Sequence, residues 1–142
     1  MPSPEPVTRP SKENIMPRIR IEATRSMEAD AAPALMDTVA ETVVATLALQ
    51  SDDRSVSFTS FAPDMFRMKP PYCLFIEILL FSGRSSEVKK RLFRSIVAAI
   101  EEKHGIPADQ VMIVLNEQPR ENWGLRGGKG GDEIDFDYTI TI

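Results

Sequence analysis

The sequence predicts an α/β fold, of the α+β kind, in which two tandem β-α-β units form a four-stranded mixed sheet with two helices on one face. Two long segments repeat apolar residues at every fourth position, which indicates amphipathic helices. Each segment lies between short runs with strand patterns. The units also align: segment 53–56 matches 109–112 at an offset of 56 residues, and 21–22 matches 76–77 at an offset of 55. This match indicates an internal duplication.

The first unit begins at Pro17, where residues 18–23 alternate charged and apolar side chains and predict a strand. A helix is predicted from about Asp30 to Leu49. Its apolar face carries four residues spaced by four: Leu35, Val39, Val43 and Leu47. Residues 55–61 alternate again and predict a second strand. A helix of this length can connect two parallel neighbouring strands.

The second unit repeats this order. The apolar run 72–81 predicts its first strand. Ser85 is a suitable N-cap for the next helix, and Gly105 is a suitable stop signal. The apolar face of that helix is formed by Val88, Leu92, Ile96 and Ile100. Residues 111–115 are apolar throughout, so we expect a strand buried on both faces.

The two ends of the chain differ in character. Residues 1–15 hold four prolines and little to bury, so they are interpreted as a disordered or non-native extension before a single domain over 16–142. In residues 134–142 apolar and polar side chains alternate without exception, which predicts a C-terminal strand after a hairpin at 127–131. One face of that strand is apolar, and the sheet face away from the helices has no cover. We therefore expect this strand to pack against a neighbouring subunit.

Composition excludes several classes of function. A net charge of −4 argues against a nucleic-acid partner. The single histidine and the single cysteine leave no basis for a metal site or an internal disulfide, and Cys73 is expected to be a buried, inert thiol. The longest apolar run is interrupted by Glu77, and no secretory signal is recognisable, so we expect a cytoplasmic protein without a membrane span.

Three motifs in this frame resemble the tautomerase superfamily, which includes 4-oxalocrotonate tautomerase and malonate semialdehyde decarboxylase. The first is Met16-Pro17 before the opening strand. The second is 83–85 (Gly-Arg-Ser) with Lys89 at the start of the second helix. The third is 117–119 (Glu-Gln-Pro) followed by 122–128. The resemblance implies a trimer with inward-facing sheets, a small carboxylate substrate and no cofactor.

The family's base is an amino-terminal proline, and by resemblance it corresponds to Pro17. A free amine at that position could accept a proton from a carbon next to a carbonyl group. If residues precede Pro17, its nitrogen is a tertiary amide without basicity, and the proline only opens an edge strand. Arg84 corresponds to the family's substrate arginine, which binds a carboxylate and stabilises enolate charge. The alternative for Arg84 is a surface arginine beside a helix N-terminus.

Two further residues correspond to positions of the family. Trp123 matches the aromatic residue of a hairpin that forms an apolar wall, although a lone tryptophan is as often a core or interface residue. Asp53 matches an aspartate that the decarboxylase branch uses to orient water or substrate. Asp53 could equally be a turn residue before the second strand.

The sequence departs from two branches of the family. Ser82 replaces the first arginine of the decarboxylases' Arg-x-Arg pair, and Phe81 stands where the dehalogenase branch has another arginine. The first helix also lacks that branch's histidine. These departures favour simple keto–enol tautomerisation of a 2-keto acid. The alternatives are a non-catalytic trimeric binding protein and, third, a decarboxylase or hydratase of a three-carbon acid.

Overall fold

The computed structural model describes residues 17–24, 27, 30–50 and 54–135. The expectations for residues 1–15 and for most of the C-terminal strand lie outside these ranges. The larger elements are β1 (Arg18–Ala23), α1 (Ala31–Thr46), β2 (Ser55–Ser60), β3 (Leu74–Phe81), α2 (Ser86–His104) and β4 (Val111–Gln118). A small hairpin of β5 (Gly124–Leu125) and β6 (Lys129–Gly130) follows, with short 3₁₀ turns beside it.

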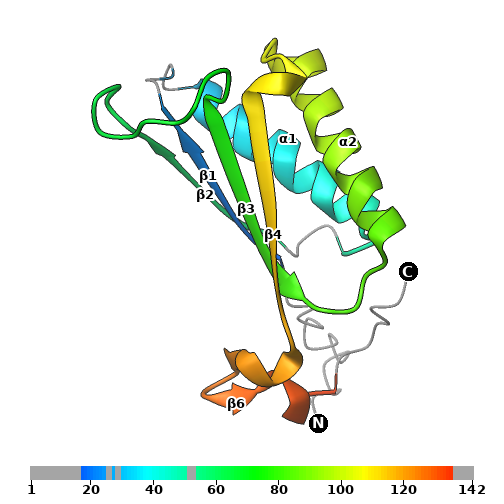
Figure 1. The fold of residues 1–142 in the computed structure, drawn as a ribbon. Coiled ribbons are helices and arrows are strands. Elements are labelled where there is room, and N and C mark those ends of the chain that lie inside the picture. The colour runs from blue at the N-terminus through cyan, green and yellow to red at the C-terminus, as the bar shows by residue number, and fades with distance from the viewer. Residues whose placement is uncertain (1–16, 25–26, 28–29, 51–53, 136–142) are drawn as a thin grey trace, which may run out of the picture.

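The four long strands form one mixed sheet in the order β2-β1-β3-β4. β1 pairs with β2 in parallel and β3 with β4 in parallel, while the two central strands, β1 and β3, are antiparallel. Each parallel pair is joined by one helix, and both helices cover the same face of the sheet (Figure 1). The predicted duplicated β-α-β architecture is therefore confirmed.

The core lies between this sheet face and the two helices. Alternate residues of β1 and β3 point into it and are at most 2% exposed: Ile19, Ile21, Ala23, Leu74, Ile76, Ile78 and Leu80. The predicted apolar faces of both helices are buried against these strands. Both caps of α2 are also confirmed. Ser85 Oγ accepts a hydrogen bond from the backbone N–H of Val88, and Gly105 adopts a left-handed conformation with φ of 70°.

A period of 55 residues keeps the buried faces of the two units in phase, because it aligns the buried Ile21 with the buried Ile76. Ile21 pairs with Phe58, and Ile76 pairs with Ile113, so both units join their strands with the same separation. The 56-residue offset from the 53–56 motif would exchange the buried and open faces of a strand, because side chains alternate at period two. That offset is therefore wrong for the strands.

Three expected elements differ in extent. The first helix spans Ala31–Thr46 instead of reaching from Asp30 to Leu49, and Asp30 makes no side-chain cap. β3 begins at Leu74 and not at residue 72. β4 continues to Gln118 because the whole of β3 is available as a partner.

Two predictions of burial were wrong. β4 is not buried on both faces of this chain, since the Val114 side chain is 42% exposed on the face away from the helices. Cys73 is half-buried and not fully buried, and its Sγ donates to Oε1 of Gln110 at 3.4 Å.

The two helices are joined by a polar contact near one end. Thr38 Oγ1 of α1 lies 2.7 Å from Nε2 of His104, the last residue of α2. Desolvation by burial, with a smaller contribution from the positive charge of Lys103, lowers the pKa of His104 below its ordinary value of 6.5. The neutral imidazole is therefore the form that fits the folded protein.

The lowered pKa of His104 predicts a pH-dependent stability. Since the folded pKa is lowered, the unfolded chain binds more protons below about pH 6.5, and stability is lost as the pH falls through that value. We expect thermal denaturation to show a larger advantage of the wild type over His104→Gln at pH 7.5 than at pH 5. If the wild type were more stable than His104→Gln by the same amount at both pH values, this would contradict a lowered pKa of His104.

Candidate functional site

Most of the sequence-predicted site residues come together at one end of the sheet. β1 starts at this end, and β3 and β4 finish there, below the helices in Figure 1. Arg18 pairs with Leu79, so continuing the antiparallel register by one residue places Pro17 opposite Leu80. Leu80 in turn pairs with Glu117. Pro17, Leu80 and Glu117 therefore form one row across three strands.

The row faces the helices. Pro17 is buried, and alternation along the strand places it on the same face as Ile19. Leu80 belongs to the core, and Glu117 alternates with the inward-facing residues of β4. The start of the first strand thus meets the ends of β3 and β4 beneath the N-terminus of α2.

Arg84 lies in the short loop between β3 and α2 and is buried, with 9% of its surface exposed. Its Nη1 donates to the backbone carbonyl of Phe81 at 3.3 Å. Gly83, just before it, has a φ of 133°, a conformation that favours glycine and turns the chain sharply out of β3. The alternative of a surface arginine is therefore wrong, because Arg84 is mostly buried and its guanidinium group is bound to the carbonyl of Phe81.

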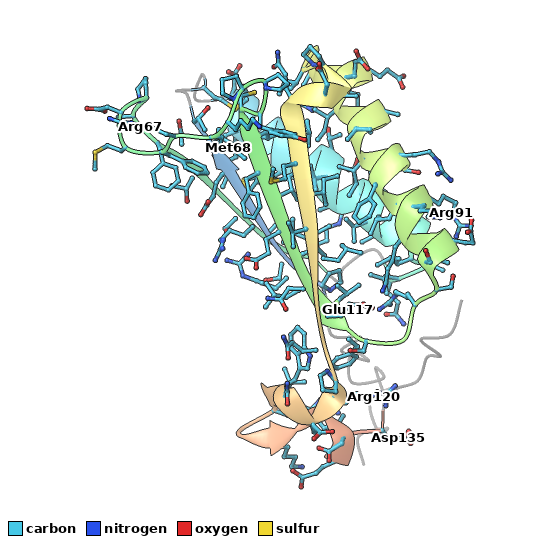
Figure 2. All side chains as sticks on the ribbon, in the orientation of Figure 1. Arg67, Met68, Arg91, Glu117, Arg120 and Asp135 are labelled. Carbon is cyan, nitrogen blue, oxygen red and sulfur yellow. The ribbon has the colours of Figure 1, made fainter. Side chains whose placement is uncertain are left out.

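A second cation at this end was not given a role by the sequence. Lys89, on the second turn of α2, donates from Nζ to Oε1 of Glu117 at 2.5 Å. The other oxygen, Oε2, is buried and has no hydrogen-bond partner among the residues that the structure describes. Figure 2 shows Glu117 at the lower end of β4. The motifs quoted above contain both Lys89 and Glu117. Each of them alone, however, resembles an ordinary charged residue of a helix or a turn.

Trp123 reaches the same end from the opposite face of the sheet. Its ring meets Phe81 edge to face at 5.2 Å, and its Nε1 donates to the backbone carbonyl of Gln118 at 3.3 Å. The guanidinium carbon of Arg120 lies 5.6 Å from the centre of the Phe81 ring. Phe81 thus separates Trp123, which packs on its ring, from Arg84, which binds its carbonyl oxygen.

Asp53 lies outside the described residues, so its expected role is untested. Arg54, the next residue, forms an ion pair with Glu41 of α1 at 3.7 Å. Ser55 pairs with Arg18, so β2 begins at the same end of the sheet as β1. Arg54 is therefore at the candidate site's end of the sheet.

A shallow cavity of about 350 Å³ lies at the other end of the sheet and does not include these residues. It is lined by the loop residues Arg67 and Met68 (Figure 2) together with Glu22, Phe75 and Met112. Within the described ranges, no group of three or more His, Cys, Asp or Glu side chains could hold a metal ion. No helix in those ranges is long and apolar enough to cross a membrane.

With this geometry in view, the chain can be compared with known proteins. The family model described as "Tautomerase enzyme" matches residues 53–126, which is more than half of the chain. The protein therefore belongs to the tautomerase family, and the sequence resemblance is confirmed.

Two relatives carry the same name. The 2-hydroxymuconate tautomerase of Comamonas testosteroni is 36% identical over 53 residues, which cover 37% of this chain and 84% of that protein. The 2-hydroxymuconate tautomerase of Pseudomonas putida is 34% identical over 53 residues, with the same coverage of both chains.

Solved structures resemble the whole duplicated domain. A malonate semialdehyde decarboxylase inhibited by 3-bromopropiolate has a TM-score of 0.71 and 24% identity, covering 80% of this chain and 92% of that chain. A fused 4-OT described as a symmetric trimer has a TM-score of 0.73 and 18% identity, covering 82% of this chain and 97% of that chain. At these identities the likeness shows a shared fold.

The Lys89–Glu117 pair predicts a measurable contribution to stability. Lys89→Met leaves the mostly buried Glu117 carboxylate without its cation, so we expect a loss of about 1–3 kcal/mol in the free energy of unfolding. The matched control is Lys90→Met, because Lys90 forms an exposed pair with Glu87 on the same helix. That control should change stability by less than about 0.5 kcal/mol. Equal effects of the two variants in urea denaturation would contradict the prediction.

Proposed function

We propose that this protein is a tautomerase that catalyses keto–enol proton transfer on a small 2-keto carboxylate, with Pro17 as an amino-terminal base. The observation that carries the proposal is that Pro17, at the start of β1, and the loop with the buried Arg84 lie at the same end of the sheet in a chain of the tautomerase family. The 2-hydroxymuconate tautomerases among its relatives support an enol carboxylate as the substrate class.

Pro17 acts in this proposal as the group that moves the proton. A free α-amine titrates near pH ~8, and apolar burial and a nearby cation both favour its neutral form. The buried position of Pro17 and the neighbouring Arg84 loop supply those two influences. The neutral amine removes the enol proton from oxygen, and the resulting ammonium delivers a proton to carbon.

Arg84 binds the substrate carboxylate and stabilises the negative charge that develops on the enolate. A guanidinium group can hold a carboxylate through two parallel hydrogen bonds. Because Arg84 is mostly removed from water, its interaction with an anion is stronger than that of an exposed arginine. Trp123 supplies an apolar wall, either to this site or to the site of a neighbouring subunit.

We propose that the active assembly is a homotrimer whose open sheet faces point inward. The open face carries a polar network in which Arg20 pairs with Glu77 at 2.6 Å and Asn116 donates to Glu77 at 3.4 Å. The half-exposed apolar residues beside it, including Val114, would gain cover from a second copy. The trimeric state of fused 4-OT supports the same arrangement. A cytoplasmic location and a substrate taken from solution complete the proposal.

Decarboxylation or hydration of a three-carbon acid is the second candidate. The likeness to malonate semialdehyde decarboxylase favours it, and Asp53 could orient a water molecule. Ser82 in place of an arginine weakens it, because one cation fewer is available to bind the substrate. If Pro17 is never amino-terminal, the remaining candidate is a non-catalytic trimeric binding protein.

The role of Pro17 can be tested by changing the start of the chain. A chain that begins at Pro17 should convert enol-pyruvate derivatives to their keto forms, because its amine is free. The chain of residues 1–142 should be inactive, and Pro17→Ala in the shorter chain should lower kcat by about 100-fold or more. The measurement is loss of enol absorbance, with the N-terminus checked by intact mass. Equal activity of both chains would remove Pro17 from the mechanism.

The role of Arg84 can be tested against an arginine of the following helix, α2. Arg84→Ala should lower kcat/KM by about 100-fold, since removing such a donor costs ~3 kcal/mol of transition-state stabilisation. The matched control is Arg91→Ala, because Arg91 is exposed and projects from α2 away from the sheet (Figure 2). We expect the control to keep wild-type kinetics. Comparable losses in both variants would contradict a specific role for Arg84.

A further inference from the structure

We propose that Glu117 contacts the substrate, its Oε2 accepting a hydrogen bond from the enol hydroxyl group and taking that proton as the keto form is made. This inference rests on the proposed tautomerase function and changes one step of it. Glu117, in place of the Pro17 amine, receives the proton from oxygen, and Pro17 delivers its proton to carbon.

The first argument is the state of the carboxylate itself. Oε1 of Glu117 is bound by Lys89, while Oε2 is buried and has no donor in residues 17–24, 27, 30–50 and 54–135. A buried acceptor without a donor is unfavourable, and such groups are uncommon in native proteins. A ligand that carries a hydroxyl group would supply the donor.

The second argument is the position of Glu117 relative to the other groups of the site. Pro17, Leu80 and Glu117 occupy one row of the sheet, so the Cα atoms of Pro17 and Glu117 are separated by two strand spacings, about 10 Å. Arg84 is anchored to the carbonyl of Phe81, the residue after Leu80. The cation is thus anchored one residue beyond Leu80, the residue that lies between the proposed base and the acceptor.

The third argument is orientation. Lys89 is held on the second turn of α2, where its backbone N–H donates to the carbonyl of Ser85. By binding Oε1, Lys89 fixes the plane of the carboxylate and leaves Oε2 as its remaining acceptor. Lys89 is therefore a positioning residue in this proposal, and Glu117 is the one that touches the substrate.

The proton transfers balance. The O–H bond of the enol breaks, and its proton forms a new O–H bond on Oε2 of Glu117. The electrons of that bond form the C=O bond, and the C=C electron pair takes a proton from the Pro17 ammonium group. The cycle thus starts with Pro17 as an ammonium group and Glu117 as a carboxylate, and it leaves a neutral amine and a protonated carboxyl group. A net proton transfer from Glu117 to Pro17 through solvent then restores both groups.

The test uses two saturated acids that cannot tautomerise and differ in one hydroxyl group: 2-hydroxypentanoate and pentanoate. Calorimetry on the purified protein gives the ratio of their dissociation constants. We expect the wild type to bind 2-hydroxypentanoate about 10-fold more tightly, as is typical of a hydrogen bond to a charged group. Glu117→Gln should reduce this preference, and the double variant Lys89→Met/Glu117→Leu should abolish it.

The double variant keeps the test valid if a single change disturbs folding. It removes both charges, so neither is left buried without its partner. The matched control is Glu87→Gln/Lys90→Met, which removes an exposed ion pair from the same helix. We expect the control to keep the wild-type preference. If the Lys89–Glu117 pair only holds α2 against β4, the double variant should weaken the binding of both acids equally. The ratio of their dissociation constants would then stay unchanged, which would overturn the proposal.

The same measurements separate this inference from the proposed function. In one outcome, the wild type binds both acids tightly with nearly equal dissociation constants, and Arg84→Ala abolishes the binding. That outcome would overturn the role of Glu117 and leave the proposed carboxylate site intact. In another outcome, the preference for the hydroxyl acid depends on Glu117, but activity does not depend on Pro17. That outcome would support the contact between Glu117 and the hydroxyl group and overturn the role of Pro17 as the base. Absence of binding by either acid would overturn both.

Discussion

The pairing of β3 with a different neighbour on each side is the constraint on which the rest of the structure depends. β3 runs antiparallel to β1 and parallel to β4, so its pairing with β1 joins the two duplicated units into one sheet. Its register also decides which residues meet at the end of the sheet, since Leu80 lies between Pro17 and Glu117. A shift of one residue would turn Leu80 out of the core and Phe81 into it.

Phe81 connects the two faces of the sheet at this end. It is 1% exposed although it alternates with the core residues of β3, because the hairpin that carries Trp123 folds over it. Its carbonyl oxygen meanwhile accepts a hydrogen bond from Arg84. The aromatic hairpin and the buried cation therefore contact the same residue, one through its ring and the other through its carbonyl oxygen.

The sequence was sufficient for the architecture because the signals were local. The apolar period of both helices, the Ser85 cap and the Gly105 stop each depend on a few neighbouring residues. The predictions that were wrong concerned contacts between residues that are far apart in the sequence. The period of 55 residues follows from which strand residues are buried, such as Ile21 and Ile76, and the exposure of Val114 depends on what packs against the open face of the sheet. Likewise, Lys89 and Glu117 are 28 positions apart, so each stands in a sequence motif but their pairing is visible only in the structure.

Duplication within one chain also limits the number of bases that the proposed chemistry can have. The second unit has the same frame, but its first strand is entered from Cys73, whose backbone N–H donates to the carbonyl of Gln110. A peptide nitrogen in that position has no basicity, whatever side chain follows it. If Pro17 is the base, each chain therefore has one working unit and one that contributes the arginine, the Lys89–Glu117 pair and the aromatic hairpin. The two halves are then free to diverge, because only the first has to present an amine and only the second has to bind an anion.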